Sequence, residues 1–262
     1  MYIKKLNHEV KNFYIFIIGQ FVSQFGSKLT SYGLVLWSYK ESGSVLSMAL
    51  LGICYLVPEV LLSFMAGSIS DRWNKKKIML VSDTIAAIFS VLVIILLAEN
   101  ALKLEYLYII NFMLGITDSF QNPASEVTIS AIVSRDNYIK TSAVRTFCNS
   151  FTSIFAPIIA TAIYSFLGLK YIVIIDLTTF IIAFVTLAFF VRIPEIYIGK
   201  KTSEENLWRQ CKVGIIYLID RRDIFSLILF MGFVNFIAAI YNTNLSPMIF
   251  LGMEIIQCSW GW

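Results

Sequence analysis

The sequence predicts an all-α, polytopic membrane protein, and three observations support this class. Hydrophobic residues make up 58% of the 262 positions and charged residues only 15%, whereas soluble domains are typically about 45–50% apolar and about 25% charged. The apolar residues gather in runs of about 20, the length that a helix needs to cross the hydrocarbon layer. These runs lack two-residue alternation, which favours helices as the structure that satisfies the backbone in lipid.

Seven runs are predicted to span the membrane. The first follows Lys4, Lys5 and Lys11, as the apolar core of a signal peptide would, but it continues to Trp37 without a small-residue cleavage site. We therefore interpret it as an uncleaved span. Each later run is long, apolar and separated from the next by a polar segment. The predicted spans are 13–37, 45–69, 78–98, 105–127, 141–167, 171–192 and 224–250.

The basic residues predict the orientation of the chain. Of the 21 lysines and arginines, sixteen lie in the N-terminal segment and the second, fourth and sixth loops. Three lie on the other side (Lys40, Lys103 and Lys170), and two, Lys28 and Arg145, fall within runs. Because short cytoplasmic loops carry the excess of lysine and arginine, we expect a cytoplasmic N-terminus in the plasma membrane.

The longest polar segment, 194–223, is predicted to be a cytoplasmic connector. Its residues Thr202–Glu205 resemble a capping box, and an apolar stripe with basic residues on other faces follows. A helix lying at the membrane surface fits this pattern, and a solvated tether is the alternative. The predicted regions are thus a bundle over 1–193, the connector over 194–223, and a seventh helix with a tail of no clear signature over 224–262.

The loop between the second and third runs carries the most specific motif. It reads Gly-Ser-Ile-Ser-Asp-Arg-Trp-Asn-Lys-Lys-Lys from residue 67 to residue 77. This segment resembles motif A of the major facilitator superfamily, which forms a gating loop between the second and third helices. Asn74 stands where the motif has its second glycine, and both residues tolerate a left-handed turn. The matching residues are Gly67, Asp71, Arg72, Lys75, Lys76 and Lys77.

Further segments are similar to the drug-exporter branch related to macrolide efflux proteins. They are Asp83, Pro123-Ala124, Ser142–Arg145, Ile175–Leu177 and the connector. Two motifs depart from the family pattern. The fourth run lacks the family's arginine over 111–115, and the fifth has Ala156, Pro157 and Ala160 in its small-residue motif. The small residues still permit close helix packing.

The resemblance implies a secondary active transporter that exports a small amphipathic or drug-like solute by alternating access with proton exchange. The expected partners are the lipid bilayer, the solute and protons, with no cofactor and no nucleic acid. The family has twelve helices in two halves, with substrate between the halves. The chain matches the first half plus one helix, so we expect a truncated copy that needs its C-terminal half or a second copy. A non-transporting fragment or scaffold is the alternative.

Ionisable residues inside the spans are candidates for function, because charge is costly in lipid. Lys28, Glu59 and Asp118 lie deepest, whereas Asp83, Glu126, Arg145 and Asp176 lie nearer the span ends. We hypothesise that Asp118 or Glu59 is the protonatable group and that Lys28 or Arg145 is its counter-charge. A structural ion pair is the alternative. Four phenylalanines are predicted either to line a cavity or to pack against helices and lipid: Phe120, Phe147, Phe151 and Phe155.

The sequence offers little for other classes of protein. A membrane enzyme would need a nucleophile, base or metal constellation. The single histidine, His8, lies in the polar N-terminal segment, and the four cysteines have no ligand spacing. The net charge of +4 is mild and not arranged as a basic stripe with interleaved aromatics. Neither a metal site nor an enzymatic activity is therefore predicted.

Overall fold

A computed structural model describes residues 2–133, 137–191, 193, 220–235 and 237–238. The chain divides into two compact units, Met1–Thr202 and Ser203–Trp262. Most of the predicted connector (194–219) and of the tail (239–262) lies outside the described residues. In the second unit the described residues are mainly helical, at the start of the predicted seventh span. The count of seven spans therefore stays a prediction.

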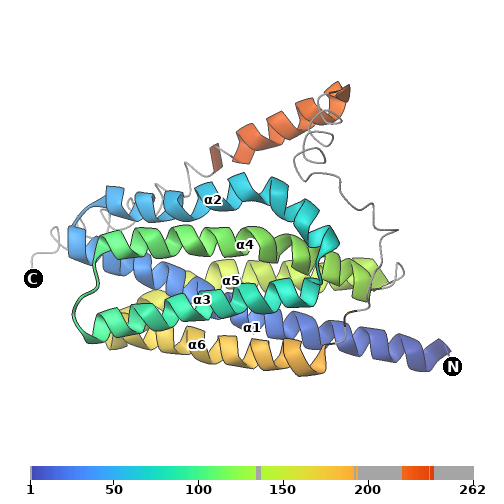
Figure 1. Ribbon diagram of the computed structural model, residues 1–262, viewed down its shortest axis with the longest axis horizontal. Coiled ribbons are helices and arrows are strands. Elements are labelled where there is room, and N and C mark those ends of the chain that lie inside the picture. Colours follow the sequence, from blue (N-terminus) through green and yellow to red (C-terminus); the bar gives the residue numbers. More distant parts are fainter. Residues whose placement is uncertain (1, 134–136, 192, 194–219, 236, 239–262) are drawn as a thin grey trace, which may run out of the picture. The chain divides into compact units, whose positions relative to one another are not determined.

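The described elements of the first unit are all helices, which confirms the all-α part of the predicted class. Consecutive helices run antiparallel (Figure 1), and each of the six predicted spans corresponds to one helix. Several helices extend past the apolar runs, because backbone hydrogen bonding continues into the polar ends. In order, the elements are α1 (Tyr2–Ser42), α2 (Val45–Arg72), α3 (Lys75–Ala98), α4 (Leu104–Ile132), α5 (Tyr138–Leu167), α6 (Leu169–Val185) and a π-helical turn, η2 (Thr186–Phe190).

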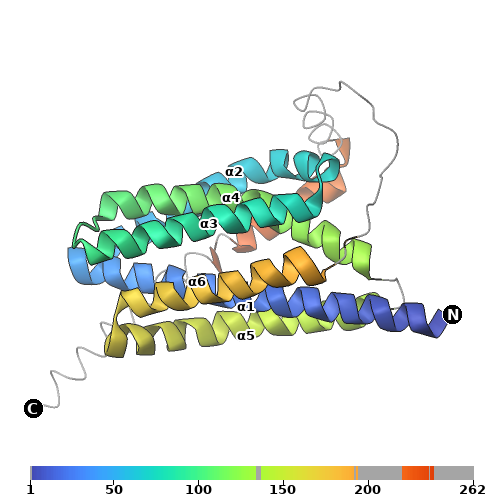
Figure 2. The same ribbon diagram turned by 60° about the horizontal axis from the view of Figure 1, so that its bottom comes forward.

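The helices pack as two groups that α3 joins. α1 contacts α5 and α6 along its length, α2 packs mainly on α4, and α3 lies against both α4 and α6 (Figure 2). Glycine allows the closest approach between α2 and α4. A Cβ on Gly115 of α4 would overlap the backbone carbonyl oxygen of Tyr55 and lie 2.8 Å from Cγ of Pro58 in α2. The two backbones therefore touch at Gly115.

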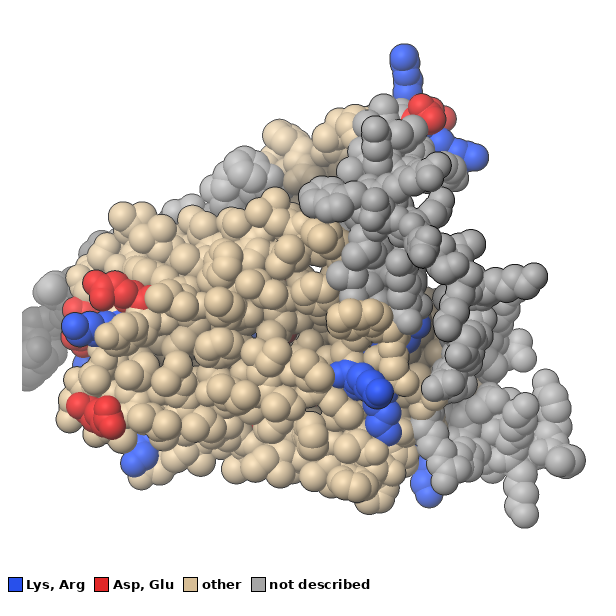
Figure 3. Space-filling model, in the orientation of Figure 1, with Lys and Arg blue, Asp and Glu red and all other residues tan. Residues whose placement is uncertain are grey.

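The outward sides of α3 and α6 are apolar. Val81, Ile88 and Ile95 of α3, Ile181 of α6 and Phe189 of η2 are all exposed. On the face shown in Figure 3, the charged side chains of the helices gather toward the two ends, and the band between them is largely uncharged. The hydrocarbon layer of a membrane is apolar, and it accommodates an uncharged, apolar band of this kind. These sides of α3 and α6 therefore face lipid.

Four of the described helices have the length and composition to cross a membrane: Val45–Ser63, Lys75–Ala98, Tyr138–Leu167 and Leu169–Phe190. The predicted spans in α1 and α4 are long enough, but they are not apolar enough to be included among these four. Both helices carry several polar or charged residues along one side, including Lys28 and Asp118, which lowers their mean hydropathy. They belong to the same antiparallel bundle as the four apolar helices (Figure 2).

The motif A segment joins α2 to α3 and also holds the end of η2. Asn74 has a φ of −67°, so it does not use the left-handed turn that this residue type tolerates. It caps α3 instead, and its Oδ1 accepts a hydrogen bond from the backbone N–H of Lys77 at 3.2 Å. The Nζ of Lys76 donates to the carbonyls of Ala188 and Val191, both at 2.9 Å. A cation at the last carbonyls of a helix satisfies unpaired acceptors and the helix dipole.

Replacing Lys76 by Met is expected to loosen the junction of α3 with η2. The variant loses two hydrogen bonds from a charged donor, which is worth about 1–3 kcal/mol of stability. Thermal unfolding of the purified protein in detergent measures the loss. Lys77→Met is the matched control, because the side chain of Lys77 is exposed and only its backbone N–H contributes to the cap. Equal destabilisation by both changes would contradict this role for Lys76.

Candidate functional site

One open side of the bundle is polar instead of apolar. Exposed polar residues recur at helical spacing on α1, α4 and α5, in segments predicted to lie within the membrane. Polar groups at this depth are found where they face protein or a water-filled cavity, because lipid cannot hydrogen-bond them. We call this surface the polar face. Its residues are Gln24, Ser27, Lys28 and Ser31 of α1, Asn122 and Glu126 of α4, and Ser142, Thr146, Asn149, Ser150 and Ser153 of α5.

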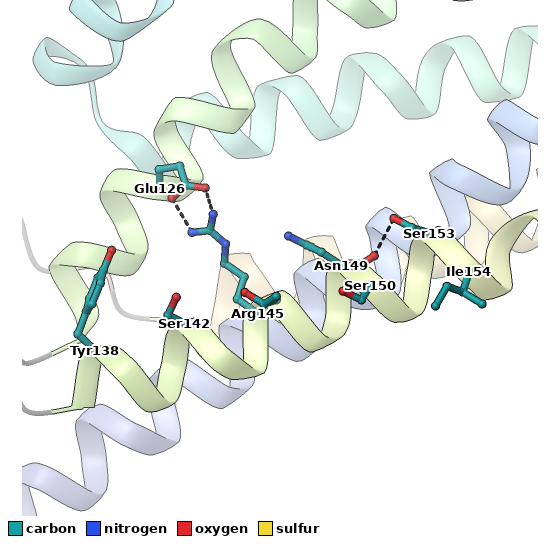
Figure 4. Close-up of a pocket in the computed structure, with 9 residues that line it drawn as sticks. Glu126, Tyr138, Ser142, Arg145, Asn149, Ser150, Ser153 and Ile154 are labelled. Carbon is teal, nitrogen blue, oxygen red and sulfur yellow. Dashed lines mark hydrogen bonds and ion pairs between the residues drawn. The ribbon is translucent and has the colours of Figure 1, made fainter. Parts of the chain in front are cut away.

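A pocket of about 470 Å³ lies on the polar face where α5 meets Glu126 of α4. Figure 4 shows hydroxyl, amide and charged side chains following one another along α5. Their spacing of three and four residues places them on one side of the helix. The lining residues are Glu126, Tyr138, Ser142, Arg145, Thr146, Asn149, Ser150, Ser153 and Ile154.

Arg145 and Glu126 form a two-point ion pair among the residues that line this pocket. Each of the two terminal nitrogens of Arg145 lies 2.5 Å from a different carboxylate oxygen of Glu126. The side chains are 34% and 57% exposed, so water screens the pair and limits its contribution to stability. The pair joins α4 to α5 (Figure 4). Arg145, one of the two candidate counter-charges, therefore bonds Glu126 and neither Glu59 nor Asp118.

Two carboxylates connect α2 to α4 through successive hydrogen bonds. The hydroxyl of Tyr55 donates to Oδ2 of Asp118 at 2.5 Å. One turn further along both helices, the amide nitrogen of Asn122 donates to Oε1 of Glu59 at 3.1 Å. Because the residues at 55 and 59 and those at 118 and 122 are each four apart, the two bonds lie side by side. We call these two bonds the α2–α4 ladder.

The ladder lies within the electrostatic range of Lys28 on α1. Lys28 is close enough to interact electrostatically with both Glu59 and Asp118, and Asp118 is close enough to interact with Glu59. No nitrogen–oxygen distance of 4.0 Å or less joins Lys28 to either group among the described residues. The structure thus brings together three of the four predicted charge-site residues, at the edge of the polar face. Lys28 itself is exposed there.

Other predicted residues have packing roles. Ala156 and Ala160 are fully buried against Leu29 and Ile172, where small side chains bring α5 close to α1 and α6. Phe151 contacts the rings of Phe21 and Phe25 on α1, which favours packing over cavity lining for this residue. Gly67 lies near the end of α2 with no atom near its Cβ position. For Asp71 and Arg72 the structure describes only the backbone, in the last turn of α2.

Two further carboxylates are buried. Asp83 of α3 is 4% exposed, and its Oδ1 accepts a hydrogen bond from Gln121 of α4 at 2.6 Å. Asp176 of α6 is 7% exposed and accepts hydrogen bonds from two serines. Sequence reasoning missed Tyr55, Asn122 and the polar side of α5. The polar side was detectable, because Ser142, Asn149 and Ser153 recur at helical spacing inside an apolar run.

A bundle of antiparallel membrane helices with one polar open side is the architecture of a transporter half, and comparison with known proteins agrees. The sequence profile of the Major Facilitator Superfamily matches residues 16–260. The chain therefore belongs to this superfamily, as motif A predicted, and it is a multi-pass membrane protein.

Individual relatives define the resemblance further. The chain is 25% identical over 226 residues to macrolide efflux protein A of Streptococcus pyogenes, covering 86% of this chain and 56% of that protein. It is 28% identical over 188 residues to macrolide efflux protein A of Enterococcus faecalis, covering 72% and 57%. It is 24% identical over 236 residues to an uncharacterized MFS-type transporter, YkuC, of Bacillus subtilis, covering 86% and 54%. The chain spans about half the length of these curated relatives.

Proposed function

We propose that this chain forms one bundle of an exporter for a small amphipathic or drug-like solute, such as a macrolide. The observation that carries the proposal is the polar face, which needs water or protein in front of it inside a membrane. Two of the relatives are named as macrolide efflux proteins, which supports export as the direction. In this proposal the solute binds on the polar face, with the pocket beside Arg145 and Asn149 contributing to it.

A second bundle covers the polar face in the transporting form. It is either a C-terminal half or a second copy of this chain, and the solute passes between the two bundles as they rock against each other. The proposed regions are the bundle 1–193, the connector 194–223 and the start of the second bundle in 224–262. The connector and the loop that follows Arg72 lie on the cytoplasmic side, as the excess of basic residues there favours.

Proton exchange is the proposed source of energy. Glu59 and Asp118 are adjacent carboxylates in the α2–α4 ladder, and Lys28 supplies a nearby positive charge. Two interacting carboxylates in a poorly hydrated site favour the sharing of a proton between them. Release of that proton to one side and its uptake from the other would couple export to the proton gradient. Motif A then serves as the hinge region that restrains α2 and α3.

The polar face is tested by its access to water. In a background whose four native cysteines are replaced by alanine, the Asn149→Cys variant is expected to react with a membrane-impermeant maleimide at least about tenfold faster than Thr178→Cys. Residue 149 lies on the polar face, whereas residue 178 lies on the exposed side of α6 among lipid-facing residues. Addition of a macrolide is expected to slow the reaction at residue 149 and leave residue 178 unchanged. Equal reaction at the two positions would contradict a wet cavity on this side.

A further inference from the structure

The pocket beside Arg145 contains a row of hydrogen-bonding side chains for which the described residues provide no partner. Ser142, Thr146, Asn149 and Ser150 line it from successive turns of α5, and we call these four residues the α5 row. Figure 4 shows Ser142, Asn149 and Ser150 along the helix that carries Arg145. No hydrogen bond joins any of the four side chains to another described residue. Unpaired polar groups at membrane depth require water or a ligand beside them.

Hydroxyl groups on the lipid-facing sides of the bundle behave differently. Thr84 of α3 and Thr178 of α6 are exposed, and their hydroxyls donate to backbone carbonyls of the preceding turn at 2.6 and 2.7 Å. Such bonds satisfy a hydroxyl in lipid. On α5, Ser153 also bonds its own helix, at the carbonyl of Asn149, at 2.9 Å. The α5 row makes no bond of this kind, so its groups are available to a ligand in the pocket.

The pocket carries no net charge. Its lining residues include one anion, Glu126, and one cation, Arg145, and these neutralise each other through two bonds. A charged solute group would have to displace one partner and leave the other unpaired, which is unfavourable within a membrane protein. A neutral group leaves the pair intact, and it can still bond the remaining N–H groups of the guanidinium and the remaining lone pairs of the carboxylate. The pocket therefore favours a neutral hydrogen-bonding group.

We propose that the α5 row binds a neutral, hydroxyl-bearing ring of the solute, with a glycosidic sugar as its chemical class. The inference rests on the proposed function, because it names the group of the amphipathic solute that the polar face recognises. A sugar presents several hydroxyls that both donate and accept, as the groups of the α5 row do. From Ser142 to Ser150 the row extends over about 12 Å along the helix, so more than one hydroxyl can be bound at once.

The pocket also accommodates the apolar part of such a solute. Ile154 lines the pocket one turn beyond Ser150 and is 59% exposed. The apolar body of a glycoside can contact Ile154 while its sugar bonds the α5 row, because residues four apart follow one another along one side of a helix. The pocket volume of about 470 Å³ lies within the range of about 300–1,000 Å³ that is typical of small-molecule sites.

Three small probes distinguish the chemistry of the bound group. Phenyl β-D-glucoside, phenyltrimethylammonium and benzenesulfonate share an aromatic ring, and they carry a neutral sugar, a cation and an anion. The reporter is Ile154→Cys in the cysteine-free background, with the whole chain in phosphatidylcholine nanodiscs so that no glycoside detergent competes. We expect phenyl glucoside to slow the reaction of this cysteine with a maleimide saturably. The two charged probes are expected to leave the rate unchanged.

Variants of the α5 row assign the protection to hydrogen bonding. Asn149→Ala combined with Ser150→Ala is expected to raise the concentration of phenyl glucoside for half protection by about tenfold or more, because at least two hydrogen bonds are lost. Both side chains are exposed, and an unchanged reaction rate without probe verifies that the double variant folds. Thr161→Ala is the matched control, since its hydroxyl lies on the same helix outside the pocket and bonds its own backbone. It is expected to keep full protection.

Arg145→Gln tests the exclusion of charged groups. The variant removes the cation and leaves the carboxylate of Glu126 uncompensated among the lining residues. Phenyltrimethylammonium is then expected to protect Ile154→Cys, while phenyl glucoside continues to do so. A selectivity that stays the same in Arg145→Gln would contradict the neutralising role of the ion pair and overturn the inference.

Equal protection by all three probes, protection by a charged probe alone, or no protection would likewise overturn the inference. In each of these cases a reactive Ile154→Cys still shows a pocket that water enters, and the proposed export stands. If neither Ile154→Cys nor Asn149→Cys reacts, water does not reach the polar face, and the proposed function fails together with the inference.

Discussion

Asp118→Asn is expected to abolish proton-coupled export. An amide keeps the size and hydrogen-bonding capacity of the carboxylate, and it can still accept the hydrogen bond from Tyr55. It cannot, however, bind and release a proton. In inverted membrane vesicles that contain the protein and have an acidified lumen, the variant should lose at least about tenfold of the proton efflux that an added macrolide triggers, which corresponds to about 1.4 kcal/mol or more in the coupled step.

Two further variants make the result specific. Glu105→Gln changes an exposed carboxylate in the first turn of the same helix, and it should leave the coupled flux unchanged. Glu59→Gln should reduce the flux, because Glu59 lies within the electrostatic range of Asp118 one turn along the ladder. If Asp118→Asn retains the flux with an unaltered pH profile, Asp118 is not the proton carrier. Glu59 is then the remaining candidate for the protonatable group.

Gly115→Leu is expected to prevent the bundle from folding. Even the first carbon of a side chain at this position overlaps the backbone of α2 at Tyr55, and a backbone cannot move aside as a flexible side chain can. Overpacking usually costs about 1–3 kcal/mol. Separation of α2 from α4 would also break both bonds of the α2–α4 ladder, so the total should exceed about 3 kcal/mol.

The yield of monodisperse protein in size-exclusion chromatography measures this effect, together with unfolding in denaturing detergent. Gly52→Leu is the matched control, since no atom lies within 4 Å of a Cβ at that position of α2. It should fold normally, and replacement of a mid-helix glycine should even stabilise it by about 0.5–1 kcal/mol. Normal folding of Gly115→Leu would mean that α2 and α4 do not touch as described.

The helices and the family were predictable from the sequence, because run length, loop charge and the motif between residues 67 and 77 are local patterns. The partners of the charged residues were not. Arg145 was a candidate for pairing with Asp118, yet it bonds Glu126. That choice depends on how α4 and α5 are rotated about their axes, which apolar runs do not specify. The role of Lys76 was hidden for a related reason, since its acceptors at 188 and 191 lie more than a hundred residues away.

The hydrogen-bond donor of Asp118 could not be predicted from the sequence either. The depth of Asp118 in an apolar run marked it as a functional candidate, but nothing local predicted Tyr55 as its donor. The contact requires α2 and α4 to approach closely, and the missing side chain of Gly115 permits that approach. A glycine inside an apolar run can indicate close packing, but its partner helix cannot be read from the run alone.

The polar face also determines how cells must handle this polypeptide. A bundle inserted without its counterpart turns serines, an asparagine and a lysine toward acyl chains, which cannot solvate them. Membrane quality control would recognise a bundle without its partner by those exposed hydroxyl and amide groups. If a second bundle covers the polar face, as proposed, the abundance of the protein depends on how fast that bundle associates with it after synthesis, and overproduction of this bundle alone would yield rapid turnover instead of a larger pool.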